Sequence, residues 1–140
     1  MKLIITGTGR SGTSFVARKL YEAGFPLGEQ FIPPNSRNPE GYFEDIEVVG
    51  ANKQLTAGEI EALEWYDRLK DKVVAKDPHF ADNVGAVEQF FPDVLWVICE
   101  RNKEDTLRSM EKTMTPEKAL DVYTRRVNNL KHLDAIRIKI

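Results

Sequence analysis

The sequence predicts an α/β fold in which helices cover both faces of a mainly parallel sheet, giving three layers. Short apolar runs typical of buried strands alternate along the chain with stretches of helical periodicity. The 140 residues fit one compact domain, residues 1–140, and leave little room for a second. A hydrophobic fraction of 41% and a charged fraction of 30% are ordinary for globular proteins, so they exclude a disordered chain and a disulfide scaffold.

Four apolar runs are the predicted parallel strands: residues 3–6, 73–76, 94–99 and 136–140. A strand that is buried on both faces has apolar residues in succession rather than in alternation. We expect the first strand to be central in the sheet. The one irregular stretch, residues 33–41, is rich in Pro, Asn and Gly and is predicted to be a loop.

Capping signals and periodicity mark the helices between these strands. Thr56 and Glu59 have the spacing of a capping box, which predicts a helix that begins just after Thr56. A second predicted helix stops before Pro92 and has three apolar residues on one face: Val84, Val87 and Phe91.

The longest predicted helix begins with Thr115 as its N-cap and Pro116 as its first residue. An apolar stripe along this helix is expected to face the core: Leu120, Tyr123, Val127 and Leu130. A basic cluster near its end is interpreted as a solvated face: Arg125, Arg126 and Lys131.

The charge balance bears on the partners of the protein. A formal net charge of −2 argues against a nucleic-acid-binding protein, which would normally be basic. Residues 101–140 nevertheless contain 10 Lys or Arg against 6 Asp or Glu, so a local anion site is compatible with the composition. No apolar run approaches the roughly 20 residues of a membrane span, and no signal peptide precedes the first strand, so we expect a cytoplasmic protein.

Cysteine and histidine usage is sparse. The single cysteine, Cys99, lies in an apolar run, which predicts a buried thiol rather than a disulfide partner. No cluster of Cys and His has the spacing of metal ligands, so no metal is expected.

The most informative segment is residues 3–17, where a buried strand runs into a Gly-rich turn and then into a helix. Gly7, Gly9 and Gly12 allow a tight turn, so that successive backbone N–H groups point toward one place. The helix that follows adds unpaired amides and the positive end of its dipole. This combination predicts a phosphate-binding loop.

Gly7 and Gly12 have the spacing of the P-loop pattern G-x-x-x-x-G-K-[ST], so we expect a domain of the P-loop NTPase-like type. Thr13 replaces the lysine of that pattern, and Ser14 follows it. The lysine that nucleoside triphosphatases usually have at this position is therefore missing from this sequence. Arg10 lies inside the loop and is predicted to place a fixed positive charge on the bound anion.

Residues 7–14, GTGRSGTS, resemble the 5'-phosphosulfate-binding loop of the sulfotransferases, which commonly reads P-[KR]-[ST]-G-T-[TS]. The resemblance implies that the loop holds the 5'-phosphosulfate of 3'-phosphoadenosine 5'-phosphosulfate (PAPS). The residues implied are Thr8, Gly9, Arg10, Ser11, Gly12, Thr13 and Ser14. Gly9 stands where the family has proline.

Residues 97–109, VICERNKEDTLRS, are similar to the 3'-phosphate motif of the same family. In that motif an Arg at the end of a strand is followed by a Ser on the next helix, and here these are Arg101 and Ser109, 8 positions apart. After the chain turns, about two turns of 3.6 residues would aim Ser109 back at the same anion. Two phosphate sites at one sheet edge imply a doubly phosphorylated nucleotide.

Two further segments look like parts of sulfotransferases: VAKDP at 74–78 and NPEGYFED at 38–45. The first implies that Lys76 lies near the transferring group and stabilises the departing phosphate. The combined resemblance covers residues 1 to about 109 and, more loosely, the strand at 136–140. Many family members continue beyond the point where this chain stops, so the domain is expected to be shortened at its C-terminal end.

The family takes its catalytic base from a Glu that follows the first helix or from a His. Glu29, Glu40 and Glu44 fall in the first region, and we choose Glu44 because the two aromatic residues before it lower its hydration. Glu40 is a close second. His79 is a further alternative, ranked lower because it follows Lys76 by three positions where the family's His follows by two.

The resemblance implies a sulfotransferase that moves a sulfuryl group from PAPS to a hydroxyl or amine of an unidentified acceptor, without a metal. Arg10, Lys76 and Glu44 are the expected catalytic residues. Two alternatives stay open. One is a P-loop kinase-like phosphoryl-transfer enzyme, which would prefer ATP with magnesium. The other is a catalytically silent nucleotide-binding module.

Overall fold

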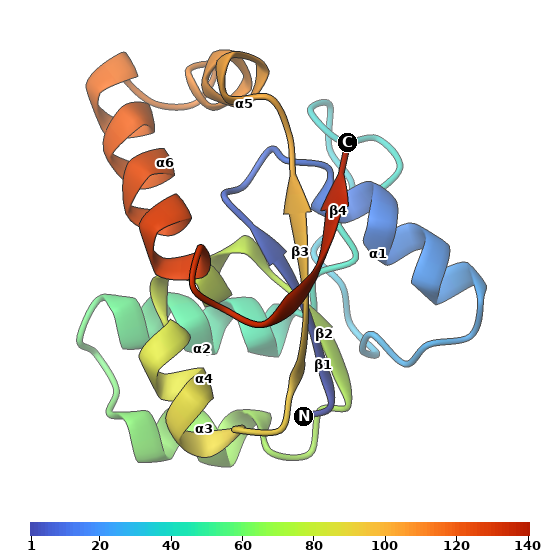
Figure 1. Cartoon of the computed structure of the whole chain (residues 1–140). Helices are drawn as coiled ribbons and strands as arrows, with labels where there is room; N and C mark the ends of the chain where they lie inside the picture. The colour runs from blue at the N-terminus through green and yellow to red at the C-terminus, as the bar shows by residue number, and fades with distance from the viewer.

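A four-stranded sheet organises the domain (Figure 1). The computed structural model describes every residue from 1 to 140. The strands are β1 (Leu3–Gly7), β2 (Val74–Lys76), β3 (Leu95–Glu100) and β4 (Ala135–Lys139), in the order β2-β1-β3-β4. Every pairing is parallel, so the predicted α/β fold is confirmed, as is the position of β1 between two neighbours.

Helices connect the strands and cover both faces of the sheet (Figure 1). One face is covered by α1 (Thr13–Glu22). The other face is covered by α2 (Ile46–Thr56), α3 (Ala62–Leu69), the short 3-10 helix η1 (Pro78–Asp82), α4 (Val84–Phe90) and α6 (Pro116–Leu130). Helix α5 (Lys103–Met110) follows β3 beyond the edge of the sheet.

The strands divide the core into two clusters because successive side chains of a strand point to opposite faces. On β3, Trp96 and Ile98 belong to the larger cluster, which includes residues from α2, α3, α4 and α6. Val97 and Cys99 belong to the smaller cluster, which contains residues of α1. The sheet is therefore the middle one of three layers, and the carboxyl ends of β1, β2 and β3 open at a common edge.

Two of the three helix signals in the sequence are confirmed. Thr115 caps α6, since its hydroxyl accepts a hydrogen bond of 3.2 Å from the backbone N–H of Lys118. The apolar face of α4 is buried against the larger cluster, as predicted. The capping box at Thr56 is wrong, because Thr56 is the last residue of α2 and its hydroxyl donates back to the carbonyl of Asn52 at 3.0 Å. Helix α3 begins only at Ala62.

The buried face of α6 is also different from the predicted stripe. Leu120 is 47% exposed, and the side chains that turn inward are Ala119, Val122, Arg126 and Leu130. Small Ala119 allows α6 to pack closely, and buried Arg126 has its own partners on η1 and on the loop after β1, described below. Of the predicted stripe, Leu130 is buried in the larger cluster, and Tyr123 packs against a small separate cluster of Met110, Ala119 and Val122.

Cys99 is a buried free thiol, as expected, and burial raises its pKa to about 11. None of the helices combines the length and the apolar character needed to cross a membrane.

Candidate functional site

The turn from β1 into α1 contains three residues with positive φ: Gly9 at 88°, Arg10 at 55° and Gly12 at 90°. Left-handed backbone costs a residue with a Cβ about 1–2 kcal/mol, which explains glycine at two of these positions. Gly12 is the N-cap of α1, and no side chain caps this end of the helix. The first N–H groups of α1 therefore remain available to a ligand in the cleft beside them.

Ser11 is packed inside this loop. Its hydroxyl is buried and has no hydrogen-bond partner within the chain. A buried polar group without a partner costs about 1–3 kcal/mol, and the tight packing of the loop carries this cost. Gly7 makes room for the loop, since a Cβ there would lie 2.8 Å from the carbonyl oxygen of Cys99.

Arg10 connects the loop with α5. Its Nε donates a hydrogen bond of 2.8 Å to the hydroxyl of Ser109, which is almost completely buried. Arg101, at the end of β3, donates from Nη1 to the backbone carbonyl of Arg10 at 3.3 Å. Asn102 caps α5 by accepting from the N–H of Asp105 at 3.2 Å, and this fixes the helix that presents Ser109. The structure thus brings Arg10, Arg101 and Ser109 together.

Lys76 lies at the carboxyl end of β2, beside the start of α1. Although only 1% of its side chain is exposed, its Nζ has two partners, the carboxylate of Glu44 and the hydroxyl of Ser14, the latter at 3.1 Å. Burial raises the pKa of Glu44, and the positive charge of Lys76 opposes this increase. Lys76 therefore supplies a buried ammonium next to the position where the loop has Thr13 in place of lysine.

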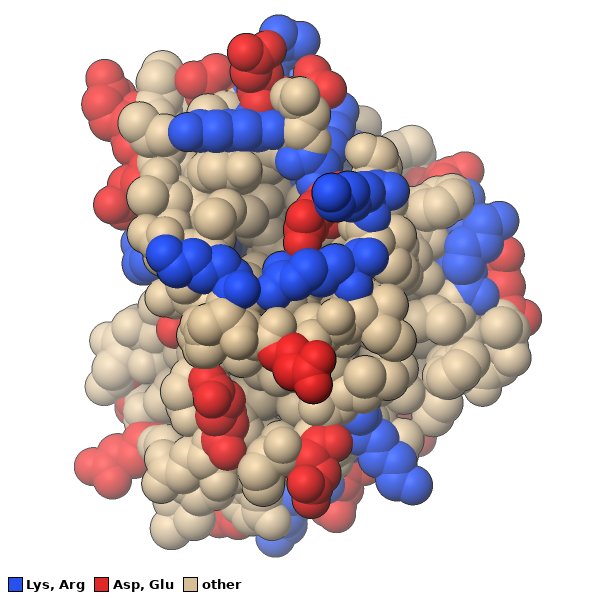
Figure 2. Space-filling model, viewed as in Figure 1, with Lys and Arg blue, Asp and Glu red and all other residues tan.

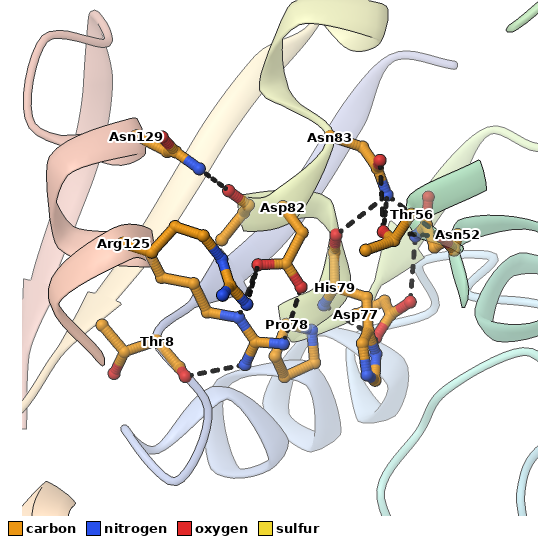
Figure 3. Close-up of polar contacts among 12 residues, drawn as sticks. Thr8, Asn52, Thr56, Asp77, Pro78, His79, Asp82, Asn83, Arg125 and Asn129 are labelled. Atoms are coloured by element: carbon orange, nitrogen blue, oxygen red, sulfur yellow. Dashed lines mark hydrogen bonds and ion pairs between the residues drawn. The ribbon is translucent and has the colours of Figure 1, made fainter. Parts of the chain in front are cut away.

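His79 presents a second polar arrangement to the same cleft (Figure 3). The carboxylate oxygen Oδ1 of buried Asp77 lies 2.7 Å from His79 Nδ1 and accepts the backbone N–H of His79 at 3.1 Å. Asp77 is also the N-cap of η1, and Pro78 is its first residue. The sequence analysis did not assign a role to Asp77, although an Asp directly before Pro is a recognisable helix-start signal.

The other two candidate bases lie elsewhere. Glu40 is 68% exposed and forms an ion pair with Arg18. Glu29 is exposed and borders a separate depression beside Asp45. Of the four candidate bases, only Glu44 and His79 line the cleft.

The cleft has a volume of about 350 Å³ and is basic. Five of its lining residues are cationic and one is acidic, Glu44: the cations are Arg10, Arg37, Lys76, Arg101 and Arg126. Among the loop residues expected to bind phosphate, five line it: Gly9, Arg10, Gly12, Thr13 and Ser14. Ser11 is buried behind them, and Thr8 borders a neighbouring pocket instead.

Arg126 is a site residue that the sequence analysis misplaced on a solvated face. Its guanidinium binds both carboxylate oxygens of Asp82, with Nε at 3.1 Å from Oδ1 and Nη2 at 2.8 Å from Oδ2. Nη1 donates to the carbonyl of Thr8 at 2.9 Å. Arg126 therefore ties α6 to the loop, and it is buried because Asp82 neutralises it. Arg125, by contrast, is 46% exposed.

A second pocket of about 320 Å³ lies between α6 and the carboxyl ends of β3 and β4. Arg101 lines both this pocket and the cleft. Figure 2 shows Lys and Arg side chains gathered around a hollow on this face, and the basic residues at the pocket are Arg101, Lys131 and Arg137. The guanidinium of Arg137 already has partners within the chain, since it donates to three carbonyls at the end of α6: those of Leu130, Lys131 and Leu133.

Comparison of the chain with models of protein families, with curated proteins and with solved structures finds no match. Any function assigned to the chain therefore depends on the geometry of its own residues.

Proposed function

We propose that the protein is a sulfotransferase of P-loop NTPase-like fold that transfers a sulfuryl group from PAPS to a hydroxyl or amine acceptor. One observation carries the proposal: Arg10 of the Gly-rich loop and Ser109 of α5 are joined by a hydrogen bond of 2.8 Å, with Arg101 bonded to the backbone of the same arginine. Two segments from distant parts of the chain, both proposed to bind anions, thus share one cleft. A nucleotide with phosphates at both its 5' and 3' ends has the charge distribution that suits them.

The loop suits the phosphosulfate end of the donor. Open N–H groups at the start of α1 and the guanidinium of Arg10 would provide its hydrogen-bond donors. Lys76 would stabilise the charge that develops on the departing phosphate, since its ammonium already reaches Ser14 at 3.1 Å. Arg101 and Ser109 would hold the 3'-phosphate.

The transfer needs one proton acceptor. The acceptor oxygen or nitrogen attacks sulfur, a new bond to sulfur forms, and the bond between sulfur and the bridging phosphate oxygen breaks. The bonding electron pair leaves with 3'-phosphoadenosine 5'-phosphate, and the proton of the attacking group passes to a base. The sequence favours Glu44 as this base, but in the cleft its carboxylate is paired with Lys76. His79 is the alternative that the cleft also contains.

Calorimetric titration tests the proposal. We expect 3'-phosphoadenosine 5'-phosphate to bind more tightly than ADP or ATP with magnesium. The proposal fails if ATP with magnesium binds most tightly, which would favour a phosphoryl-transfer enzyme. It also fails if removal of the 3'-phosphate leaves the affinity unchanged.

A matched pair of arginine variants locates the 3'-phosphate. Arg101→Ala should weaken 3'-phosphoadenosine 5'-phosphate by about 10- to 100-fold, because a hydrogen bond to a charged group is worth about 1.5–3 kcal/mol. Adenosine 5'-phosphate should bind almost as before. Arg108→Ala is the control, since Arg108 is 75% exposed and pairs only with Asp105 on the same helix. Equal effects of the two variants would contradict the assignment.

A further inference from the structure

A chain of buried hydrogen bonds leads from α3 through α2 to the ring of His79. The indole N–H of Trp65 donates to Asn52 Oδ1 at 2.9 Å, and Asn52 Nδ2 donates to Asp77 Oδ2, also at 2.9 Å. The other carboxylate oxygen of Asp77 faces His79 Nδ1 at 2.7 Å. Trp65, Asn52 and Asp77 are all fully buried, whereas His79 is partly exposed at the cleft.

The donor and acceptor chemistry of these groups allows only one direction for this series of hydrogen bonds, from Trp65 toward Asn52 and from Asn52 and His79 toward Asp77. An indole N–H can only donate, so the atom of Asn52 that faces Trp65 is its oxygen, and its NH₂ must face Asp77. A carboxylate oxygen can only accept, so Nδ1 of His79 carries the hydrogen. In the neutral ring Nε2 is then left as an acceptor.

The backbone around Asp77 is anchored as firmly as its side chain. Its N–H donates to the carbonyl of Ile5 on β1 at 3.1 Å, and its carbonyl accepts from the hydroxyl of Thr6 at 2.9 Å. Asn83 also holds this region, because its Nδ2 donates to the carbonyls of Asn52 and His79 at 3.1 and 3.3 Å (Figure 3). Neither the backbone nor the carboxylate of Asp77 is free to reorient.

We propose that Trp65, Asn52 and Asp77 form a positioning relay that holds His79 in the tautomer protonated at Nδ1 and presents Nε2 to the cleft as a proton acceptor. The proposal deepens the proposed function, because it assigns the group that takes the proton of the attacking hydroxyl or amine. Glu44 then serves to neutralise Lys76, with which it is already paired. Trp65 and Asn52 are positioning residues, since they act on the cleft only through Asp77.

Nitrogen NMR of the histidine rings tests the relay without any substrate. The chain contains two histidines, and His132→Gln leaves His79 as the only ring signal. His132 suits this change, because it is 59% exposed and has only Glu88 as a partner, at 3.5 Å. In the spectrum of the neutral ring we expect Nδ1 of His79 to be protonated and Nε2 to be unprotonated. The opposite tautomer would overturn the proposal.

Variants along the relay test whether its remote members matter. Asp77→Asn should reverse the tautomer, because its amide can donate to Nδ1. Asn52→Leu and Trp65→Phe, which each remove a hydrogen bond of the relay, should produce a mixture of tautomers. The control is Tyr66→Phe, which removes a hydroxyl from the next residue of α3 outside the relay. If Asn52→Leu and Trp65→Phe both leave the ring signals of the parent protein, the relay does not exist.

A second measurement on the parent protein does not depend on the folding of any variant. The indole N–H of Trp65 should exchange slowly with deuterium, as expected of a buried hydrogen-bonded donor, and fast exchange would contradict the relay. Once an acceptor substrate is known, Trp65→Phe should lower kcat roughly tenfold and leave KM unchanged. The two proposals can fail independently. If His79 has the predicted tautomer but the protein does not bind 3'-phosphoadenosine 5'-phosphate, the relay is supported and the sulfotransferase assignment is contradicted.

Discussion

The Nε atom of Arg10 donates a hydrogen bond of 2.8 Å to the hydroxyl of Ser109, a residue 99 positions further along the chain. The contact joins the loop after β1 to the helix after β3. It exists because β1 and β3 are parallel neighbours, so their carboxyl ends reach the same edge of the sheet. This edge is where ligands bind in open parallel sheets.

Removal of the Ser109 hydroxyl should therefore affect binding more than folding. Ser109→Ala is expected to weaken 3'-phosphoadenosine 5'-phosphate about tenfold, the effect of losing one hydrogen bond of about 1.5 kcal/mol to a charged group. Calorimetry provides the measurement. Thr113→Ala is the matched control, because Thr113 also lines the cleft but its hydroxyl donates to the carbonyl of Met110. A similar loss in both variants would show that Ser109 has no special role.

The sheet was predictable from sequence because buried parallel strands leave a local signal. Each predicted run overlaps a strand of the structure, and in β1, β2 and β3 the apolar run reflects burial, whereas the edge strand β4 is largely exposed. The two segments proposed to bind phosphate were recognisable for a related reason, because each consists of a strand end and the helix that follows it. What lies within one β-to-α unit can be inferred without knowledge of the rest of the fold.

Arg126 shows what could not be predicted. It is the chain neighbour of exposed Arg125, yet it is buried because both carboxylate oxygens of Asp82, 44 positions away, accept hydrogen bonds from its guanidinium. The ion pair between Lys76 and Glu44 and the contact between Asn52 and Asp77 likewise join separate units of the fold. Pairings of this kind depend on how helices pack across the sheet, and a single sequence contains no direct signal for them.

Replacement of Arg126 should destabilise the domain strongly. Arg126→Ala would leave Asp82 as a buried charge without its main partner, so we expect a loss of about 3–5 kcal/mol in the free energy of unfolding. Arg125→Ala is the matched control and should cost no more than about 1 kcal/mol, because Arg125 is 46% exposed. Urea denaturation gives both values. A comparable cost for the two variants would mean that the contacts of Arg126 do not stabilise the fold.

The same ion pair predicts a loss of stability in acid. Burial by itself would raise the pKa of Asp82, but the hydrogen bond and charge of Arg126, together with the charge of Arg125, lower it below its ordinary value of 3.8. The stabilisation is complete above pH 3.8 and is lost as the pH falls through the lower folded-state pKa. Asp82→Asn should flatten this part of the stability curve, measured by thermal unfolding at a series of pH values. An unchanged acid slope in the variant would contradict the prediction.

Glu44 should have the opposite dependence on pH. Because burial raises its pKa above 4.5, the folded protein retains a proton that the unfolded chain releases. The contribution of Glu44 to stability therefore decreases as the pH rises from 4.5 through the folded-state pKa. Glu44→Gln should remove this slope even though it lowers the overall stability by leaving Lys76 without its carboxylate. The test is the slope of stability against pH above 4.5, measured over the same pH series in the parent protein and in Glu44→Gln; an equal slope in both proteins would contradict the prediction.

Gly12 combines two constraints that separate variants can distinguish. Its φ of 90° is unfavourable for a residue with a side chain, and a Cβ there would lie 2.6 Å from Cγ1 of Ile140, the residue that follows β4. Gly12→Ala should cost about 1–2 kcal/mol for the backbone and more for the contact. Gly24→Ala is the matched control, because Gly24 has a φ of 97° and no atom within 4 Å of its Cβ position.

The excess cost of Gly12→Ala over Gly24→Ala measures how tightly Ile140 packs on the loop between β1 and α1. Ile140→Ala in the Gly12→Ala background should recover most of that excess, since a shorter side chain frees the space that the new Cβ needs. Urea denaturation of the single and double variants gives the free energies of unfolding for this double-mutant cycle. If the double variant recovers nothing, the contact between Ile140 and the loop does not contribute, and the cost lies in the backbone alone. The loop is then shaped by its own glycines and by Arg126, independently of β4.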